Sequence, residues 1–308
     1  MFTFFKNHEG KKKLARCCTL FMLSLTLLIS SVSAVYAGEA EETAAPSAQT
    51  MRALTDPVSS ARRVTVYIDG ERYGGTAVLI NNTTFVGIRE FTNLAGSGTV
   101  SWLPGEGAAL VSSRLLSVKA ANGREYIMSN GRYFWGREKN FIVDGTMYVP
   151  LRAICSSFAM TVGWNADEFA AYVTRTGESV TAGHEFYDAD EVYWLSKIIE
   201  AESRGEPMLG KIAVGNVVLN RVASSEFPNT IYSVIFDRKY GVQFSPVADG
   251  SINLTPSEES VIAAKICLEG YTVSDSALYF INASSAQDFW VTNNRTYVTT
   301  IGNHDFYA

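Results

Sequence analysis

The stretch around 192–228 has apolar residues at every third or fourth position, followed by an almost entirely apolar run. At about 100° per residue, one helical stripe collects Val192, Leu195, Ile198 and Ile199. The run that follows, IAVGNVVLNRV, is apolar nearly all round and lies within a second predicted helix at about 208–223. The pattern therefore predicts a helix pair in which the second helix is the buried partner of the first.

Glu202 is the next position on the apolar stripe of the first helix. Burial disfavours the charged form of a carboxyl and raises its pKa, which suits a group that donates a proton near neutral pH. The structural alternative is a residue at the rim of the helix whose carboxylate reaches water or a backbone amide. Glu200 is predicted to face the opposite, solvated side, and Glu206 lies at the helix break that Gly205 and Pro207 indicate.

The sequence after the helix pair predicts a loop, one further helix and a terminal hairpin. The run PNTIYSVIFDRKYGVQFSPVADGSINL lacks helical periodicity and is interpreted as a long structured loop of the kind that lines a binding groove. Thr255 is predicted to cap a helix that ends at Gly270. SALYFIN is interpreted as a strand, and the tail as a hairpin that turns at Gly302 and Asn303 and returns His304 toward the centre.

A sequence repeat precedes the helix pair, within about 62–176. In both TTFVGIREFTNLAGSGTVSW and TMYVPLRAICSSFAMTVGWN, a strand leads into a short apolar helix and then into a strand that reaches Trp102 or Trp164. VTVYIDG, just before the first copy, alternates apolar and polar positions as a half-buried strand does. Arg89 and Arg152, at the two helix starts, are predicted to be buried and to bind acids or backbone carbonyls.

Residues 1–37 have the pattern of an export signal. A basic segment precedes an apolar run from Cys17 to Val35, and a small-residue cleavage site ends at Ala37. The apolar run is near membrane-spanning length, so an uncleaved anchor is the alternative. Residues 38–60 are predicted to be a flexible linker, and 177–188 a connector in which Asp188 or Asp190 caps the next helix.

Charge and cysteine content narrow the range of partners. The chain has 26 basic and 31 acidic residues; without residues 1–37 these become 21 and 30, a net charge of −9. We therefore expect no nucleic-acid partner, and no stable membrane anchor if the signal is cleaved. Cys155 and Cys267 are interpreted as buried small hydrophobes, with a single interdomain disulfide as the alternative.

Five segments between about 192 and 307 resemble the bacterial cell-wall hydrolase family to which the spore cortex-lytic enzymes belong: EAESRGEP, GKIAVGNVVLNRV, FPNTIYSVI, QFSPVADG and IGNHDFY. The resemblance implies a lysozyme-like, mostly helical domain that cleaves peptidoglycan glycan strands, with Glu202 in the position of the family's catalytic glutamate. The repeat resembles the copper amine oxidase N-terminal-like domain of exported Gram-positive proteins. It is interpreted as a spacer, with a weak wall- or partner-binding module as the alternative. The three histidines, His8, His184 and His304, lie outside it, so we expect no copper site.

These observations together predict an α+β chain. A small mixed α/β repeat domain is followed by a lysozyme-like, mostly helical catalytic domain with a C-terminal hairpin. The expected boundaries are a signal peptide at 1–37, a linker at 38–60, a two-repeat stalk domain at 61–176, a connector at 177–188 and a catalytic domain at 189–308. We expect a secreted or cell-wall-associated protein, for which the spore cortex and the vegetative wall are both open as substrates.

Cleavage of a glycosidic bond needs an acid that protonates the leaving oxygen. A lytic transglycosylase can use a single glutamate, because the muramic acid C6 hydroxyl attacks intramolecularly. We predict this reaction at the MurNAc–GlcNAc bond, with a muramidase and a non-catalytic wall-binding protein as alternatives. Glu206 and Asp249 are candidates for a second carboxylate. The predicted substrate-binding residues, for some of which a structural role is the alternative, are Gln243, Ser245, Glu206, Tyr279, Trp290 and His304. No metal or cofactor is expected, since the sequence has no HExxH motif or comparable set of ligands.

Overall fold

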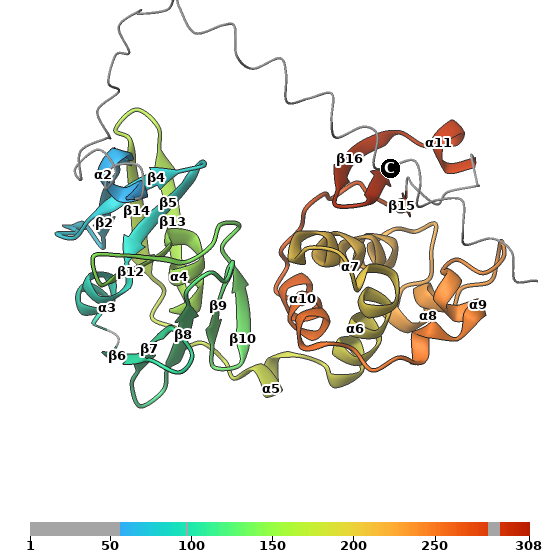
Figure 1. Ribbon diagram of the computed structural model, residues 1–308, viewed down its shortest axis with the longest axis horizontal. Helices are drawn as coiled ribbons and strands as arrows, with labels where there is room; N and C mark the ends of the chain where they lie inside the picture. Colours follow the sequence, from blue (N-terminus) through green and yellow to red (C-terminus); the bar gives the residue numbers. More distant parts are fainter. Residues whose placement is uncertain (1–55, 97, 283–289) are drawn as a thin grey trace, which may run out of the picture. The chain divides into compact units, whose positions relative to one another are not determined.

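The computed structural model describes residues 56–96, 98–282 and 290–308 (Figure 1). The predicted export signal and most of the predicted linker lie outside these residues. Among the described residues, no helix is long and apolar enough to cross a membrane. All of them belong to one structural unit, Met51–Ala308, in which a β-rich region is followed along the chain by a helical region and a terminal hairpin. The predicted α+β class and order of elements are therefore confirmed.

The β-rich region has three sheets. The first has the strand order β1 (Arg62–Arg63), β4 (Ala77–Ile80), β5 (Thr83–Gly87), β12 (Thr146–Pro150) and β11 (Phe141–Val143). The second has the order β10 (Arg132–Trp135), β9 (Tyr126–Ser129), β8 (Ser117–Ala121), β7 (Ala108–Ser112) and β6 (Thr99–Leu103). The third has the order β13 (Met160–Asn165), β14 (Ala170–Arg175), β2 (Thr65–Ile68) and β3 (Glu71–Arg72). The helices of this region are α2 (Pro57–Ser60), α3 (Ile88–Ala95) and α4 (Leu151–Ser157).

The sequence repeat corresponds to two matching strand–helix–strand units, β5–α3–β6 and β12–α4–β13 (Figure 1). Strands β5 and β12 pair antiparallel, with Val86 opposite Val149, so the two copies share one sheet and do not form separate modules. The side chains of α3 and α4 enter the same core, in which Phe91 and Ile154 are fully buried. The expected alternation in VTVYIDG is confirmed, since every second residue of β2 is buried.

The expected burial of Arg89 and Arg152 is wrong, because both side chains are exposed. Ile88 and Leu151 take the buried position at the start of each helix. The next residue then points about 100° away from the core. Nη1 of Arg89 donates to the carbonyl of Val100 at 3.3 Å, so the expected carbonyl contact is present for this arginine.

The helical region begins with the predicted helix pair, α6 (Ala189–Ser203) and α7 (Met208–Ala223). Asp188 caps α6, since its side chain accepts from the backbone N–H groups of Asp190 and Glu191. The other elements are α5 (Gly183–Phe186), α8 (Ile231–Ile235), α9 (Ser245–Asp249), a 3₁₀ turn η1 (Ser251–Asn253), α10 (Glu258–Leu268), α11 (Trp290–Asn294), and the sheet of β15 (Tyr279–Asn282), β17 (His304–Tyr307) and β16 (Tyr297–Ile301). The predicted hairpin is confirmed, with β16 and β17 paired on either side of Gly302.

Two details of this region differ from the expectation. Helix α10 is capped by the side chain of Ser257 and not by Thr255. The stretch predicted as a loop contains the short helices α8 and α9, each of five residues. Helices of this length are too short to produce a visible 3.6-residue period, which explains why the sequence did not reveal them.

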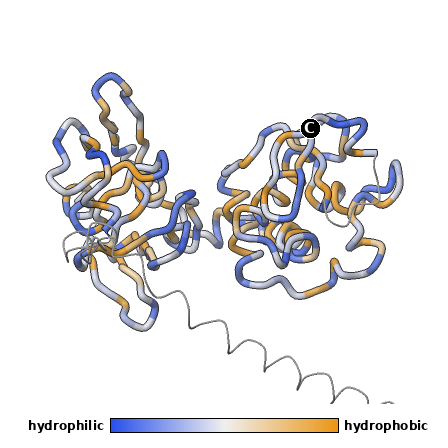
Figure 2. Tube along the Cα trace, turned by 45° about the horizontal axis from the view of Figure 1, so that its top comes forward, coloured by the Kyte–Doolittle hydropathy of each residue, from blue (hydrophilic) through white to orange (hydrophobic). Residues whose placement is uncertain are grey.

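Apolar side chains of α6, α7 and α10 fill the core of the helical region, and hydrophobic positions gather inside this part of the trace (Figure 2). Leu195, Ile198 and Ile199 are fully buried, as their helical stripe predicts. Gly215 of α7 allows close contact, because a Cβ atom there would lie 2.7 Å from Sγ of Cys267 and 2.9 Å from Cδ1 of Ile199. Cys155 and Cys267 are both buried and free, so the disulfide alternative is wrong.

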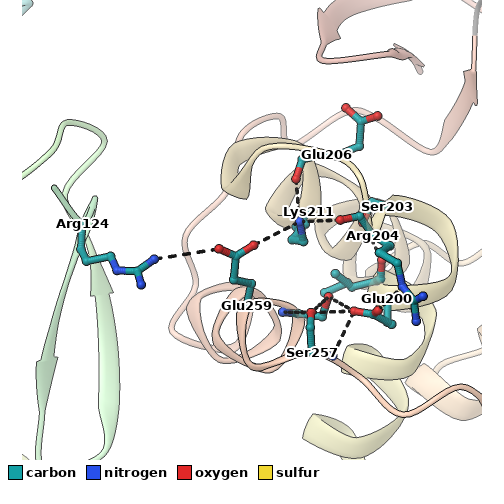
Figure 3. A network of polar contacts seen from close by, with 10 residues as sticks. Arg124, Glu200, Ser203, Arg204, Glu206, Lys211, Ser257 and Glu259 are labelled. Atoms are coloured by element: carbon teal, nitrogen blue, oxygen red, sulfur yellow. Dashed lines mark hydrogen bonds and ion pairs between the residues drawn. The ribbon is translucent and has the colours of Figure 1, made fainter.

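Glu200 is not on a solvated face, as the sequence suggested, but is 2% exposed (Figure 3). One of its carboxylate oxygens accepts hydrogen bonds from the hydroxyls of Ser257 and Ser260, both at 2.7 Å, and the other accepts from Nε of Arg204 at 2.6 Å. Burial alone would raise the pKa of this carboxyl, but the hydrogen bonds outweigh it and lower the pKa to about 2. The carboxylate of Glu200 therefore ties α6 to the N-terminus of α10, where a negative charge is also favoured by the helix dipole.

Lys211 closes the break between α6 and α7 (Figure 3). Its buried ammonium donates to the carbonyls of Arg204 at 3.0 Å and Glu206 at 2.6 Å. The last carbonyls of a helix have no partner within the helix, so these bonds satisfy groups that would otherwise need water. The turn after Glu202 is thereby held in one conformation.

Replacement of Glu200 by Ala should lower the free energy of unfolding by about 2–4 kcal/mol, because Ser257, Ser260 and Arg204 would lose their shared acceptor. Urea unfolding at neutral pH measures this loss. Since the folded state lowers the pKa of Glu200, its stabilising effect is present above the ordinary carboxyl pKa and is lost as the pH falls toward about 2. The difference between the two proteins should therefore shrink below about pH 4.

The control is Glu191→Ala, which removes an exposed carboxylate from the same helix. It should cost less than about 1 kcal/mol. Equal losses in the two variants would contradict a structural role for the carboxylate of Glu200.

Candidate active site

A groove with a volume of about 1210 Å³ lies in the helical region. Its walls come from the end of α6, the last turns of α7, the segment 237–245, strands β15 and β17, and α11 with the residues after it. Six of the residues singled out in the sequence line it: Glu202, Gln243, Ser245, Tyr279, Trp290 and His304. Residues far apart in the chain are thus brought to one surface.

Glu202 lies in the last turn of α6 and is half-buried. Burial and, to a smaller extent, the carboxylate of Asp249 raise the pKa of its carboxyl to about 7, against the opposing effect of the Arg221 guanidinium. Among the described residues, no group donates a hydrogen bond to this carboxyl that would favour its charged form. A large share of Glu202 is therefore protonated near neutral pH, as the sequence pattern led us to expect, and can donate a proton into the groove.

The two candidates for a second carboxylate, Glu206 and Asp249, do not line the groove. Asp249 ends the short helix α9 and accepts a hydrogen bond from the backbone N–H of Ser251 at 2.8 Å. Bonding to Ser251 lowers the pKa of Asp249, so this residue acts on Glu202 as a fixed negative charge. In addition to Glu202, the acidic residues that line the groove are Glu226 and Asp237. Both lie in segments without periodicity, and neither was identified from the sequence.

Glu206 is buried and does not have the environment expected of a substrate-binding residue. Its two carboxylate oxygens accept from the backbone N–H and the side-chain amide of Asn303, both at 2.9 Å. A Cβ atom at Gly302, where φ is +59°, would lie 1.8 Å from this carboxylate, so only glycine fits there. Glu206 therefore fastens the turn of the β16–β17 hairpin to the junction of α6 and α7. Burial would raise its pKa, but the bonds from Asn303 lower it.

His304 is 4% exposed and forms part of the groove wall. Its ring packs edge-on against Phe280, with centroids 5.3 Å apart, and Nδ1 lies 3.9 Å from the carboxylate of Glu206. Burial lowers the pKa of this imidazole, while the charges of Glu206 and Asp305 act in the opposite direction. His304 is therefore a core histidine that also lines the groove, and its part in substrate binding stays a prediction.

Aromatic rings form one end of the groove. The rings of Tyr279 and Trp290 lie 6.1 Å apart at 64°, and the Trp290 side chain is 50% exposed. The guanidinium carbon of Arg295 lies 4.5 Å from the Tyr279 ring and 5.1 Å from the Trp290 ring. Such a set of flat faces and donors is suited to sugar rings. Gln243 also lines the groove, and its side-chain amide donates to the carbonyl of Gly241 at 3.2 Å.

Arg221 is a groove residue that the sequence analysis missed. It is 5% exposed, Nε donates to the carbonyl of Leu278 at 2.8 Å, and burial lowers its pKa to about 10. The one available signal was its position at the end of the apolar run IAVGNVVLNRV, where a charge is unusual. That signal does not tell a groove residue from one such as Lys211, which caps backbone groups.

Comparisons with known proteins match both halves of the described chain. Residues 205–307 match the Cell Wall Hydrolase family, and residues 67–173 match the Copper amine oxidase N-terminal domain. The chain contains a cell wall hydrolase domain. The resemblance of both segments, inferred from their sequences, is therefore confirmed. The hydrolase match begins at residue 205 and does not include Glu202. Glu202 is therefore assigned as a site residue from its environment in the structure and from the neighbouring sequence.

Spore cortex-lytic enzymes are among the relatives. This chain matches the enzyme of Bacillus cereus with 39% identity over 120 residues, which cover 39% of this chain and 45% of that protein. The enzyme of Oceanobacillus iheyensis is 35% identical over 120 residues, covering 39% and 42%. The match thus spans less than half the length of these relatives. The catalytic domain of the germination-specific lytic transglycosylase SleB from Bacillus anthracis is 38% identical, with 42% of this chain and 100% of that chain covered and a TM-score of 0.37.

Glu202→Gln should stabilise the protein at alkaline pH. The folded state raises the pKa of Glu202 to about 7, so its favourable contribution is complete below the ordinary carboxyl pKa and is lost as the pH rises through about 7. At pH 8 the cell wall hydrolase domain then holds a half-buried carboxylate, which glutamine replaces without charge. The substitution should change the free energy of unfolding more favourably at pH 8 than at pH 4, by about 1–3 kcal/mol.

Thermal unfolding at the two pH values measures this gain, with Glu191→Gln as the matched exposed control on the same helix. An equal change in Tm at pH 4 and pH 8 would show that the carboxyl of Glu202 is not perturbed.

Proposed function

We propose that this chain cleaves the glycan strands of bacterial peptidoglycan, with Glu202 as the proton donor. One observation carries the proposal: a half-buried carboxyl with a pKa of about 7 lies in the groove of a cell wall hydrolase domain. The names of the relatives, spore cortex-lytic enzymes, agree with a wall substrate. The aromatic end of the groove offers surfaces against which sugar rings can stack.

The reaction begins when the carboxyl of Glu202 protonates the oxygen of the glycosidic bond as positive charge develops on the sugar ring. In a lytic transglycosylase the muramic acid C6 hydroxyl then attacks, and the carboxylate of Glu202 takes its proton as a base. The engagement of Glu206 and Asp249 outside the groove favours this one-glutamate route. Hydrolysis assisted by Asp237 or Glu226 is the alternative within the same reaction class.

One reason to consider a non-catalytic wall-binding protein is the charge of Glu200, two residues from Glu202. Glu200 was expected to lie in water, close enough to disturb the titration of Glu202. Its carboxylate is instead buried and neutralised by its own partners. Both residues can therefore titrate in separate environments.

We further infer an exported protein with an extracellular, spore-associated role. Its boundaries would be a signal peptide at 1–37, a linker at 38–60, a spacer domain at 61–176, a connector at 177–188 and the catalytic domain at 189–308. The relatives' name supports a spore-cortex substrate, and the copper amine oxidase N-terminal-like match at 67–173 supports the spacer.

Glu202→Gln should lower cleavage of purified peptidoglycan by about 10²–10⁴-fold, the usual contribution of a general acid. In the wild-type protein the rate should fall as the pH rises through about 7, because the acid must be protonated. Zymography and the release of soluble glycan fragments measure the rate, with Glu191→Gln as control. Mass spectrometry of the products distinguishes the reactions, since transglycosylation leaves 1,6-anhydro ends and hydrolysis leaves reducing ends.

Equal clearing by the wild type and Glu202→Gln would show that Glu202 is not the proton donor. Wall binding without clearing by the wild type between about pH 4 and pH 8 would favour the non-catalytic alternative.

A further inference from the structure

Arg221 is a buried cation in the groove with unused hydrogen-bond donors. Its Nε is occupied by the carbonyl of Leu278. Neither terminal nitrogen has a hydrogen-bond acceptor among the described residues, and Nη1 is fully buried. A buried donor that lacks a partner costs free energy, and more so when it carries charge. The side chain is therefore incomplete until another molecule, or a change of the groove, supplies an acceptor.

The surroundings of Arg221 hold the guanidinium in one place. Its central carbon lies 4.9 Å from the ring of Phe227, 5.0 Å from that of Phe244 and 5.3 Å from that of Tyr279. Together with the bond to Leu278, these rings restrict both the position and the plane of the group. A donor fixed in this way loses little entropy when it binds a ligand.

The charges around Arg221 favour a neutral acceptor. The groups that act electrostatically on its guanidinium are Tyr279, Asp237 and Glu202. Near neutral pH Glu202 is largely protonated, so the negative charge beside Arg221 comes from Asp237. The strongest neutral acceptor in a peptidoglycan strand is an amide carbonyl.

We propose that Arg221 donates a hydrogen bond to an amide carbonyl of the bound glycan strand and so positions the sugar against Glu202. This role rests on the proposed function. The amide has two possible sources, the acetamido group of a sugar and the amide that joins the muramic lactyl group to its peptide. Arg221 is thus a positioning residue, and the proton is still donated by Glu202.

The test compares the wild type with Arg221→Lys on three substrates: intact strands, de-N-acetylated strands, and strands whose peptides an amidase has removed. Lysine keeps the charge but cannot both hold the carbonyl of Leu278 and donate to the substrate. On intact strands kcat/KM should fall about 10–100-fold, as expected for a lost hydrogen bond to a charged group. On the strands that lack the contacted amide, kcat/KM of the wild type should fall by the same factor. The kcat/KM of Arg221→Lys should change little between these strands and intact ones.

Whichever substrate equalises the two proteins identifies the amide, and chemical re-N-acetylation should restore the difference if the acetamido group is the one. Arg114→Lys, which changes an exposed arginine of the β-rich region that does not line the groove, is the control. A ratio of wild type to variant that is the same on all three substrates would overturn the contact with Arg221 and leave the proposed function intact. A wild type that cleaves none of them would overturn the proposed function itself.

A second measurement does not require the Arg221 variant to fold. A crystal structure of Glu202→Gln with a bound glycan fragment should place an amide oxygen within about 3.2 Å of a terminal nitrogen of Arg221. A complex in which both terminal nitrogens bond only to protein groups or sugar hydroxyls would refute the assignment.

Discussion

The packing of α6 against α7 and α10 is the constraint on which the site depends. Gly215 of α7 lies so close to Ile199 of α6 and Cys267 of α10 that only a glycine fits there, and Glu200 is bonded to the start of α10. These contacts fix the rotation of α6 about its own axis. Residues two positions apart on a helix point about 200° from each other, so once Glu200 is held by α10, Glu202 must face the other way. On that side lies the groove.

Glu200 and Glu202 show that the pKa of a buried carboxyl depends on whether hydrogen-bond donors surround it. Burial raises the pKa of both side chains. Glu200 has hydrogen bonds from Ser257, Ser260 and Arg204, and its pKa falls to about 2, so it is a structural anion. Glu202 has no such donors among the described residues, and its pKa rises to about 7. The same residue type on the same helix is thus a fixed charge in one case and a largely protonated carboxyl near neutral pH in the other.

Local patterns predicted the parts of this structure that depend on neighbouring residues. The apolar stripe of α6, the cap at Asp188, the turn at Gly302 and the two matching repeat units are of this kind. The environment of Glu200 could not be predicted, because its partners Ser257 and Ser260 are 57 and 60 residues away in the chain. Arg221 was missed for the same reason: its carbonyl partner and two of its three aromatic neighbours belong to segments distant in sequence. The direction of Glu202 was predictable, since it follows from the stripe itself.

The groove also depends on a contact behind its wall. The hairpin that carries His304 is attached to the helical core through Glu206, whose carboxylate binds both donors of Asn303. Because Glu206 follows Glu202 by four residues, the segment that carries Glu202 also anchors the hairpin. The absence of a side chain at Gly302 is what lets the turn approach this carboxylate. The position of the hairpin relative to Glu202 therefore depends on the α6–α7 junction.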